Sequence, residues 1–262
     1  MATELLALAQ PIAVEVGEHL EAALAGDRFA MTSKSTPTDL VTEFDTWAEA
    51  HITKAILSAR PDDSIQGEEG ADIAGSSDVT WSVDPIDGTV NFVHAIPGFC
   101  VSIAARVNGE TVAGVVASPL HREVFTAVLG EGAMLNNRPI TCATPLAMGR
   151  SVIATGFGYR PERRRRQAEV LVEVLPHIAD IRRNGSAAID LCWVACGRID
   201  GYWEVGLNDW DYAAGALIAT EAGARCGGLH GEPPTPNFVL AAPPSVWDDL
   251  RDLLVAADAA SV

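Results

Sequence analysis

The chain has 262 residues, of which 48% are apolar, so it can bury a substantial core in one large domain or two packed halves. Its formal net charge of −17 disfavours nucleic acid and anionic membranes as partners, because phosphate groups would be repelled. No apolar run reaches the length that crosses a bilayer.

The N-terminal residues predict an amphipathic helix over 3–26 and not an export signal, since they carry several glutamates and no early basic residue. A second amphipathic helix is predicted over 42–60. The five cysteines show no zinc-type spacing, and Cys192 and Cys196 are predicted to be buried core thiols. This usage favours a reducing compartment, so we expect a cytoplasmic protein.

The middle of the chain predicts an antiparallel meander, because β-branched, glycine-punctuated runs follow one another over 99–107, 111–119 and 123–130. Alternating strands and helices follow. Strands are expected at 151–156, 178–183, 198–205, 225–228 and 237–241, and helices at 161–176, 186–197, 209–223 and 244–258. The order predicts an α+β or layered α/β fold, divided into 1–145 and 146–262.

Four acidic sites stand at the ends of predicted elements, where side chains from different elements can converge on one cleft. They are Asp45 in TEFD, Glu68 and Glu69 in QGEEG, Asp84 and Asp87 in DPID, and Asp209 and Asp211 in NDWDYAAG. Buried like charges are costly unless one is protonated or a cation lies between them. Oxygen ligands indicate a hard cation, Mg²⁺ before Mn²⁺ or Ca²⁺. In DPID the proline is expected to fix a turn that aims both carboxylates at one or two ions.

Gly88 and Thr89 follow directly and are expected to leave a turn with free backbone N–H groups and a hydroxyl. Amides at such a turn favour an anion, particularly where they open a helix. Taken singly, each of these motifs is more often a turn, a helix cap or a solvated loop. Together they indicate metal-dependent phosphoryl chemistry.

Three segments carry a resemblance to a known family: GEE, WSVDPIDGTVNFVHAIPGFCVSIA and WEVGLNDWDYAAGALIATEAGA. With them the chain resembles the inositol monophosphatase family, one of the lithium-sensitive, Mg²⁺-dependent sugar phosphatases. The resemblance runs from TPTDLVTEFD to the terminal helix. It implies a layered sandwich of helices and sheets in which N-terminal helices and a largely antiparallel sheet precede a smaller α/β half. It also implies a homodimer.

The resemblance further implies two to three Mg²⁺ ions. Glu68, Asp84 and the carbonyl of Ile86 would bind the first ion, and Asp84, Asp87 and Asp211 the second. Glu68 would also act in catalysis and reach a third, more weakly held ion.

The same resemblance assigns the groups around the substrate. The amides of Gly88 and Thr89 would meet the phosphate, and Asp45 with the Thr89 hydroxyl would orient and deprotonate the attacking water. The positions that match the substrate-ring segment and its hydroxyl-binding carboxylate are Gly185, Ser186, Ala187 and Glu204.

Three features depart from this pattern or leave it open. Asn208 and Asp209 stand where the best-studied animal members carry a histidine and a small thiol, which bears on substrate detail and not on the chemistry. Lys34 lies in a loop that closes over the metals in relatives, and it either approaches the site or is solvated. His94 belongs to the motif, and a structural hydrogen-bonding role is expected for it.

The run Arg163–Arg166 is a local exception to the acidic composition and is predicted to be a solvated helix face.

The expected activity is hydrolysis of myo-inositol 1-phosphate by a metal-activated water, with a small phosphorylated polyol as partner and neither nucleic acid nor membrane. Histidinol phosphate, fructose 1,6-bisphosphate, 3′-phosphoadenosine 5′-phosphate or a broad range of sugar phosphates are alternative substrates. A regulatory protein that retains the fold is the alternative outside enzymes.

Overall fold

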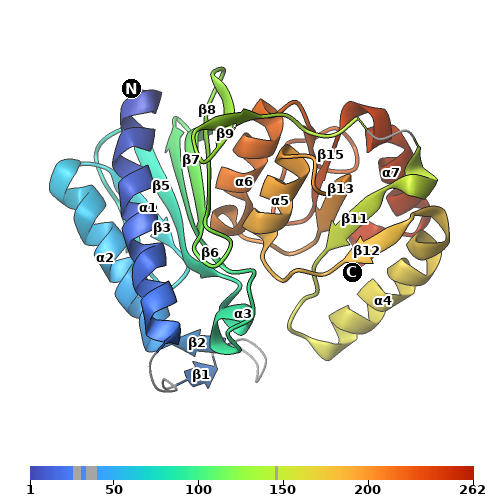
Figure 1. The fold of residues 1–262 in the computed structure, drawn as a ribbon, viewed down its shortest axis with the longest axis horizontal. Coiled ribbons are helices and arrows are strands. Elements are labelled where there is room, and N and C mark those ends of the chain that lie inside the picture. The colour runs from blue at the N-terminus through green and yellow to red at the C-terminus, as the bar shows by residue number, and fades with distance from the viewer. Residues whose placement is uncertain (26–30, 34–39, 145–146) are drawn as a thin grey trace.

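The computed structural model describes residues 1–25, 31–33, 40–144 and 147–262, with side chains described from Thr42 onward after the first gap. Its elements stack in five layers (Figure 1). Two N-terminal helices cover an eight-stranded sheet, two helices lie between this sheet and a five-stranded one, and two further helices close the opposite side. This is the layered α+β architecture that the sequence predicts.

The first half combines α1 (Ala2–Leu24) and α2 (Glu43–Ala59) with the larger sheet. Its strands, in the spatial order β10-β9-β8-β7-β6-β5-β3-β4, are β3 (Ser64–Gly67), β4 (Asp72–Ile73), β5 (Val79–Asp87), β6 (Cys100–Val107), β7 (Glu110–Ser118), β8 (Glu123–Val128), β9 (Gly132–Leu135) and β10 (Arg138–Ile140). Strands β6 to β8 form the predicted antiparallel meander. Only β3 and β5 pair in parallel among the described strands of this sheet. A short helix, α3 (Thr89–Val93), follows β5, and β1 (Met31–Ser33) pairs with β2 (Leu40–Thr42).

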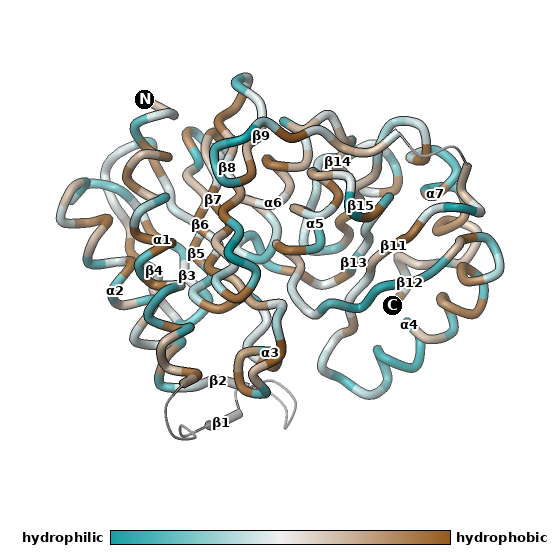
Figure 2. The backbone as a smooth tube through the Cα atoms, viewed as in Figure 1, coloured by the Kyte–Doolittle hydropathy of each residue, from teal (hydrophilic) through white to brown (hydrophobic). Residues whose placement is uncertain are grey.

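The second half is built on a mixed sheet ordered β12-β11-β13-β15-β14. Its strands are β11 (Val152–Thr155), β12 (Asp180–Arg182), β13 (Gly201–Glu204), β14 (Arg225–Gly227) and β15 (Val239–Ala242). Its helices are α4 (Pro161–Val174), α5 (Ala187–Ala195), α6 (Asp209–Glu221) and α7 (Pro244–Ala256), with 3₁₀ turns at Met148–Arg150, Leu175–His177 and Ala259–Ser261. Helices α4 and α7 lie on the outer face (Figure 1). Figure 2 shows hydrophilic residues along β12 and much of α4.

The core continues across the predicted border between the halves. One apolar cluster joins Val116 and Phe125 of the large sheet to Ala214 and Leu217 of α6 and to Tyr202 of the small sheet. Helices α5 and α6 are therefore buried on both sides, which explains why their sequences are apolar around the whole helix. The division into 1–145 and 146–262 stays a prediction.

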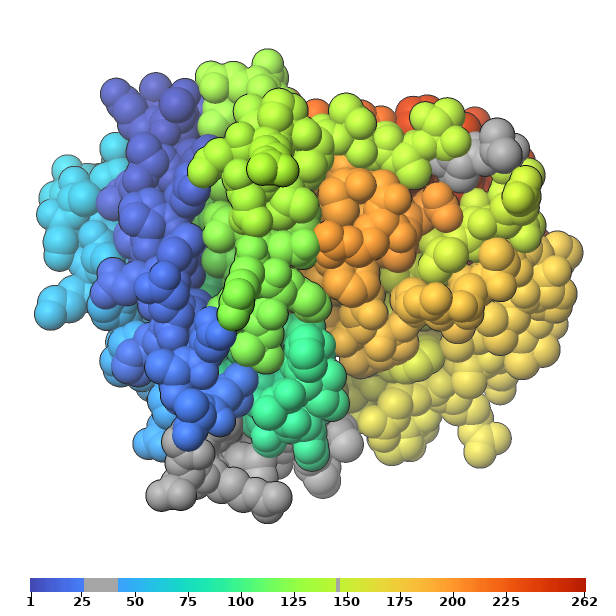
Figure 3. Space-filling view, in the orientation of Figure 1, coloured from blue at the N-terminus to red at the C-terminus, as the bar shows by residue number. Residues whose placement is uncertain are grey.

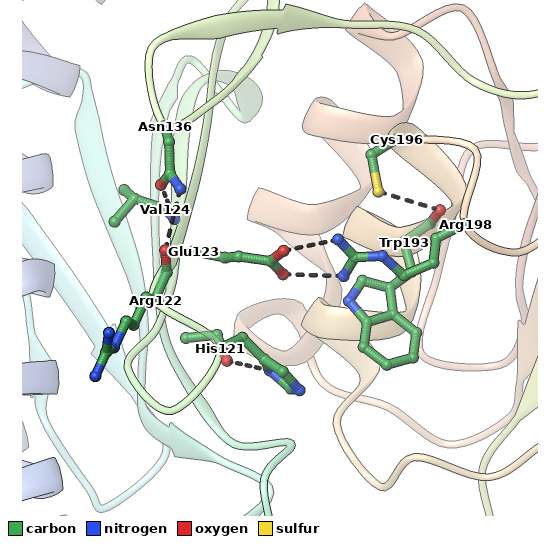
Figure 4. A network of polar contacts seen from close by, with 9 residues as sticks. His121, Arg122, Glu123, Val124, Asn136, Trp193, Cys196 and Arg198 are labelled. Atoms are coloured by element: carbon green, nitrogen blue, oxygen red, sulfur yellow. Dashed lines mark hydrogen bonds and ion pairs between the residues drawn. The ribbon is translucent and has the colours of Figure 1, made fainter.

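A polar network also links the halves (Figure 4). Arg198, which follows α5, donates two hydrogen bonds of 2.9 and 2.7 Å to the carboxylate of Glu123 at the start of β8. Its Cζ lies 5.0 Å from the centroid of the Trp193 ring. The ring of His121 meets the Trp193 ring edge-on, with 5.7 Å between centroids.

The structure differs from the sequence expectations in two places. Strand β5 does not end in a turn at Pro85 but continues to Asp87, and its register against β6 shifts between Asp84 and Asp87. Such an irregularity re-aims side chains without ending the strand.

All five cysteines are free; Cys192 is buried as predicted, whereas Cys196 is only partly buried. Within the described residues, no helix is both long and apolar enough to span a membrane.

Candidate active site

Strand β5 carries two buried carboxylates to the point where it meets α3. Asp84 is 1% exposed, and its Oδ1 accepts a 3.0 Å hydrogen bond from the N–H of Ile86. Asp87 accepts at Oδ2 from the Ser186 hydroxyl and from the Ala188 N–H, both at 2.7 Å. Because Ser186 is the N-cap of α5, these bonds fix the predicted substrate segment to the end of β5.

Two more of the predicted aspartates hold the first turns of helices. Asp45 and Asp211 are the third residues of α2 and α6, and each accepts from the N-cap backbone N–H in a capping box. These bonds are 2.7 Å from Thr42 N to Asp45 and 2.6 Å from Asn208 N to Asp211. The alternative interpretation of these motifs as helix caps is therefore correct, and the caps also fix the aspartates at helix ends that meet at the site.

The predicted Asp45–Thr89 pair is in contact. The Thr89 hydroxyl lies 3.1 Å from Asp45 Oδ1 and 3.1 Å from the carbonyl oxygen of Ile86. Asp45 is fully buried. Burial raises its pKa, although the hydrogen bonds from Thr42 and Thr89 oppose this effect.

The loop that carries Glu68 is held by a residue that sequence reasoning missed. Glu49 of α2 is buried, and its carboxylate accepts from the backbone N–H of Glu69 at 2.7 Å and of Ala71 at 2.9 Å. The available signal was its position four residues after Asp45, which places both acids on one face of α2. A carboxylate on the helix face that turns toward the core needs such partners.

The carboxylates raise one another's pKa. For Asp84 burial is the main cause, and Glu68, Asp87 and Asp211 add repulsion. For Asp211 burial is again first, followed by Asp87. The pKa of Asp87 rises to about 7, mainly through burial, despite its bonds to α5. A bound cation would remove this repulsion.

The donor set fits a hard divalent cation in its chemistry. All the candidate ligands are oxygens, which Mg²⁺ prefers. In the part of the chain that the structure describes, no three His, Cys, Asp or Glu side chains are grouped to hold a metal as they stand. The oxygens of Asp84, Asp87 and Asp211 accept instead from nearby protein groups.

One cavity of about 170 Å³ brings most predicted residues together. Those that line it are Glu68, Asp87, Gly88, Gly185, Ala187, Glu204 and Asp211. It opens between α3 and α4, which face each other across a notch in Figure 3. Asp45, Asp84, Ile86, Thr89 and Ser186 lie behind this lining and reach it through the contacts given above.

The far wall of the cavity carries Glu204. Its Oε2 accepts a 2.7 Å hydrogen bond from the hydroxyl of buried Tyr202. Burial raises its pKa, while the Tyr202 bond and the charges of Arg183 and Arg163 lower it. A Cβ atom built on Gly156 would lie within 2.1 Å of both carboxylate oxygens, so the glycine leaves the space that Glu204 fills.

Asn91 joins the two walls, a role that the sequence did not reveal. Its Nδ2 donates to the carbonyl oxygens of Gly98 and Asn184, both at 2.7 Å. The first bond closes the loop after α3, and the second ties α3 to the chain just before Gly185. The segment predicted to bind the phosphate and the segment predicted to line the substrate ring are therefore held in fixed positions relative to each other.

Three further parts of the sequence analysis concern Arg163–Arg166, Asp209 and Lys34. The prediction of a solvated face for Arg163–Arg166 is wrong for Arg163, which lines the cavity, because the first turn of α4 points inward there. Asp209 turns away from the cavity and pairs with Arg106 and the Tyr212 hydroxyl. Lys34 lies outside the described residues.

Comparisons with known proteins find relatives over most of the chain. The model of the inositol monophosphatase family matches residues 1–258. The inositol-1-monophosphatase SuhB of Mycobacterium tuberculosis is 47% identical over 233 residues, covering 84% of this chain and 80% of its own. The Nus factor SuhB of Escherichia coli is 39% identical over 234 residues, covering 85% and 88%.

Solved structures share the fold over nearly the whole length. The extragenic suppressor protein suhB of Bartonella henselae superposes with a TM-score of 0.90 at 34% identity, covering 96% of this chain and 98% of its own. Family match, sequence identity and fold agree. The chain belongs to the inositol monophosphatase family.

Proposed function

We propose that this chain is a phosphoric monoester hydrolase that releases phosphate from inositol 1-phosphate. Family membership supports the reaction class, and the name of the M. tuberculosis relative supports the substrate. The observation that carries the proposal is the junction of β5 and α3. There, the buried carboxylates of Asp84 and Asp87 adjoin the backbone of Gly88 and Thr89, and Asp87 and Gly88 line the cavity.

Glu68, Asp84, Asp87 and Asp211, with the carbonyl of Ile86, would hold two to three Mg²⁺ ions. When bound, Mg²⁺ supplies positive charge that acidifies a water and neutralises the transferred phosphoryl and leaving oxygens. The ion count is part of the proposal. The proposed cation is supported by the burial and mutual repulsion of these acids, which raise their pKa values and which a bound cation would compensate.

The chain's own groups position the reactants. The N–H groups of Gly88 and Thr89 donate to the phosphate oxygens. The hydroxyl of Thr89 accepts a proton from the attacking water and passes its own to Asp45 Oδ1, along the 3.1 Å contact. Burial has already raised the Asp45 pKa, which suits a proton acceptor. Because phosphoryl transfer depends mainly on position and charge, no covalent nucleophile is needed.

The ring of the substrate would lie against Gly185, Ser186 and Ala187, with its hydroxyls donating to Glu204. The fixed position of this segment supports that role, since Ser186 and Ala188 are bonded to Asp87. We also propose that the protein is cytoplasmic and forms a homodimer, as the family resemblance implies.

A regulatory role is the second candidate, because several relatives are named Nus factor SuhB. A protein that uses only the fold has no need of the acidic site. This chain keeps every carboxylate of that site, and Thr89 keeps its contact with Asp45. We therefore place the enzymatic function first.

The test is a phosphate-release panel with inositol 1-phosphate, histidinol phosphate, fructose 1,6-bisphosphate and 3′-phosphoadenosine 5′-phosphate, each with Mg²⁺, with chelator, and with Li⁺. We expect Mg²⁺-dependent release from inositol 1-phosphate that Li⁺ inhibits. A much higher kcat/KM for histidinol phosphate would overturn the substrate, and no release from any compound would overturn the enzymatic function.

A further inference from the structure

One buried carboxylate near the cavity has no place in the proposed reaction. Asp190 lies in the first turn of α5 and is 1% exposed, and it is not among the residues that line the cavity. Its Oδ1 accepts a short hydrogen bond from Nδ2 of Asn184. Burial raises the pKa of Asp190 well above its usual range, although the bond from Asn184 opposes this effect. A buried carboxyl group is costly without such a partner, so its role should be sought at Asn184.

Asn184 connects this carboxyl group to the opposite wall of the cavity. Its side chain donates to Asp190 of α5, while its carbonyl oxygen accepts the 2.7 Å bond from Asn91 Nδ2. Asn91 belongs to α3, whose N-cap is Gly88. The chain just before Gly185 is therefore held by its side chain from α5 and by its backbone from α3.

The chain at Gly185 passes very close to the predicted phosphate turn. A Cβ atom built on Gly185, where φ is +92°, would lie 3.1 Å from Asn91 Nδ2 and 2.4 Å from Arg183 Nη1. A Cβ atom built on Gly88 would lie 3.2 Å from the Gly185 carbonyl oxygen. A displacement of Gly185 therefore changes the distance between the parts of the site proposed for the ring and for the phosphate.

Arg183 offers a second explanation for Asp190, that of a charge pair. Its positive charge lowers the raised pKa values of both Asp190 and Glu204, so one guanidinium acts on two buried acids. In the part of the chain that the structure describes, however, Asp190 forms no ion pair within 4.0 Å. Because burial disfavours the charge of Asp190 and its close contact is with Asn184, the geometry favours the hydrogen bond over the charge pair.

We propose that Asp190 is a positioning residue for the substrate ring. Its carboxyl oxygen holds the side chain of Asn184, and this contact keeps the chain at Gly185 at a fixed distance from the Gly88 turn. The ring and the phosphate of one ester can then bind at the same time. The role requires the acceptor oxygen of Asp190 and not its charge. It rests on the proposed function for the identity of the substrate, whereas the position of the chain does not.

Two substitutions at this position separate the acceptor from the charge. Asp190→Asn keeps an oxygen that can accept from Asn184, whereas Asp190→Leu has a branched end of similar shape and no acceptor. Both remove the charge, so each is the matched control for the other. Asn184→Ala removes the donor at a half-buried position and provides the test if circular dichroism shows that Asp190→Leu does not fold.

Steady-state kinetics with Mg²⁺ tests the effect on substrate. The KM for inositol 1-phosphate should rise about 10-fold in Asp190→Leu and Asn184→Ala and stay within about 2-fold of wild type in Asp190→Asn. The inhibition constant of inorganic phosphate, which lacks a ring, should change less than about 2-fold in every variant. An unchanged KM in Asp190→Leu, or the same rise in Asp190→Asn, would overturn the proposal. An equal rise in the KM and in the inhibition constant would also overturn it, because the disturbance would not be confined to the ring.

Amide hydrogen exchange tests the position of the chain without turnover. In the full chain with chelator, the amides of Ala188 and Ile189, which bond to Asp87 and Ser186, should exchange about 10-fold faster in Asp190→Leu than in wild type. They should exchange at the wild-type rate in Asp190→Asn. Equal exchange in all three proteins would overturn the positioning role. The absence of phosphate release from every ester would refute the proposed function, while the exchange rates would still decide the role of Asp190.

Discussion

The two walls of the cavity differ in charge because different elements build them. The wall on the large sheet comes from β5, the loop after β3 and the start of α6, and it gathers carboxylates whose pKa values are raised by burial and mutual repulsion. The wall on the small sheet comes from β13 and the starts of α4 and α5. It places one carboxylate, Glu204, beside two guanidiniums. Within a chain that is acidic overall, the arginines that line the cavity therefore lie on one wall and most of its carboxylates on the other.

This difference indicates a division of labour. The acidic wall is incomplete without a cation, and with one it suits the reacting phosphate. Substitutions on the acidic wall should therefore affect turnover of every substrate, whereas those on the basic wall should affect the choice among them.

The largest effect is expected on the acidic wall. Asp84→Asn should lower kcat/KM for inositol 1-phosphate by about 1,000-fold, because it removes a ligand proposed for two ions. The fold should remain, since burial and repulsion already disfavour the charge of Asp84. Asp78→Asn, an exposed position just before the same strand, is the matched control. Wild-type activity in folded Asp84→Asn would refute the proposed metal site.

The pH dependence of stability should carry the signature of the same wall. The pKa of Asp87 is raised from 3.8 to about 7, so between these values the folded state binds more protons than the unfolded state. In chelator, the free energy of unfolding should therefore fall as the pH rises from about 4 to about 7, with Asp87 contributing at most ~4 kcal/mol and the raised pKa values of Asp84 and Asp211 adding to the fall. Urea unfolding at several pH values measures this.

Two comparisons check the cause of that slope. Asp87→Asn should flatten it, and Mg²⁺ should offset the fall because a cation favours the ionised carboxylate. A free energy of unfolding that rises with pH over the same range would contradict the assignment.

A smaller effect should appear on the basic wall. Gly206→Ala places a Cβ atom against the guanidinium of Arg163 at a position with φ of +80°. Gly231→Ala is the matched control, because φ there is +91° and no atom lies within 4 Å of the new Cβ. Both should lose ~1 kcal/mol from backbone strain. Only Gly206→Ala should also raise the KM for inositol 1-phosphate, because Arg163 lines the substrate cavity; equal KM values in both variants would show that Arg163 does not depend on Gly206.

The smallest effect is expected where the two halves meet at the surface. A double-mutant cycle with Glu123→Gln and Arg198→Gln should give a coupling energy of ~0.5–1 kcal/mol, because the pair is bidentate but partly exposed. The exposed Arg182–Asp180 pair lies within one half and should give less. Thermal unfolding measures both, and a coupling energy near zero for Arg198 and Glu123 would contradict a role in joining the halves.

The sequence predicted the elements well wherever apolar periodicity governs the structure. Helices α1, α2 and α4 to α7 and strands β6 to β8 lie where the patterns place them. Strand β5 was harder to predict, since Pro85 signals a turn while pairing with β6 keeps the strand extended. Cys196 was misjudged because periodicity identifies the buried side of a helix but not where a neighbouring element stops covering it.

The candidate site was predictable in its motifs but not in its supports. The carboxylates stand out because they interrupt apolar elements. Glu49, Asn91 and Arg163 do not, because each acts through a partner distant in sequence: the loop after β3, the chain before α5, and the backbone at Gly206. Such partners follow from the packing of elements and not from local pattern.

The position of α6 between the sheets has a consequence for folding. Its inward and outward faces both belong to the cluster that joins the sheets, and its first turn carries Asp211. A fragment that ends near residue 145 would expose the face of the large sheet that α6 covers. The slowest-exchanging amides of α6 and of β6 and β7 should therefore open together, in a single cooperative unit. The last proposed metal ligand, Asp211, then comes into place only when α6 packs against the large sheet.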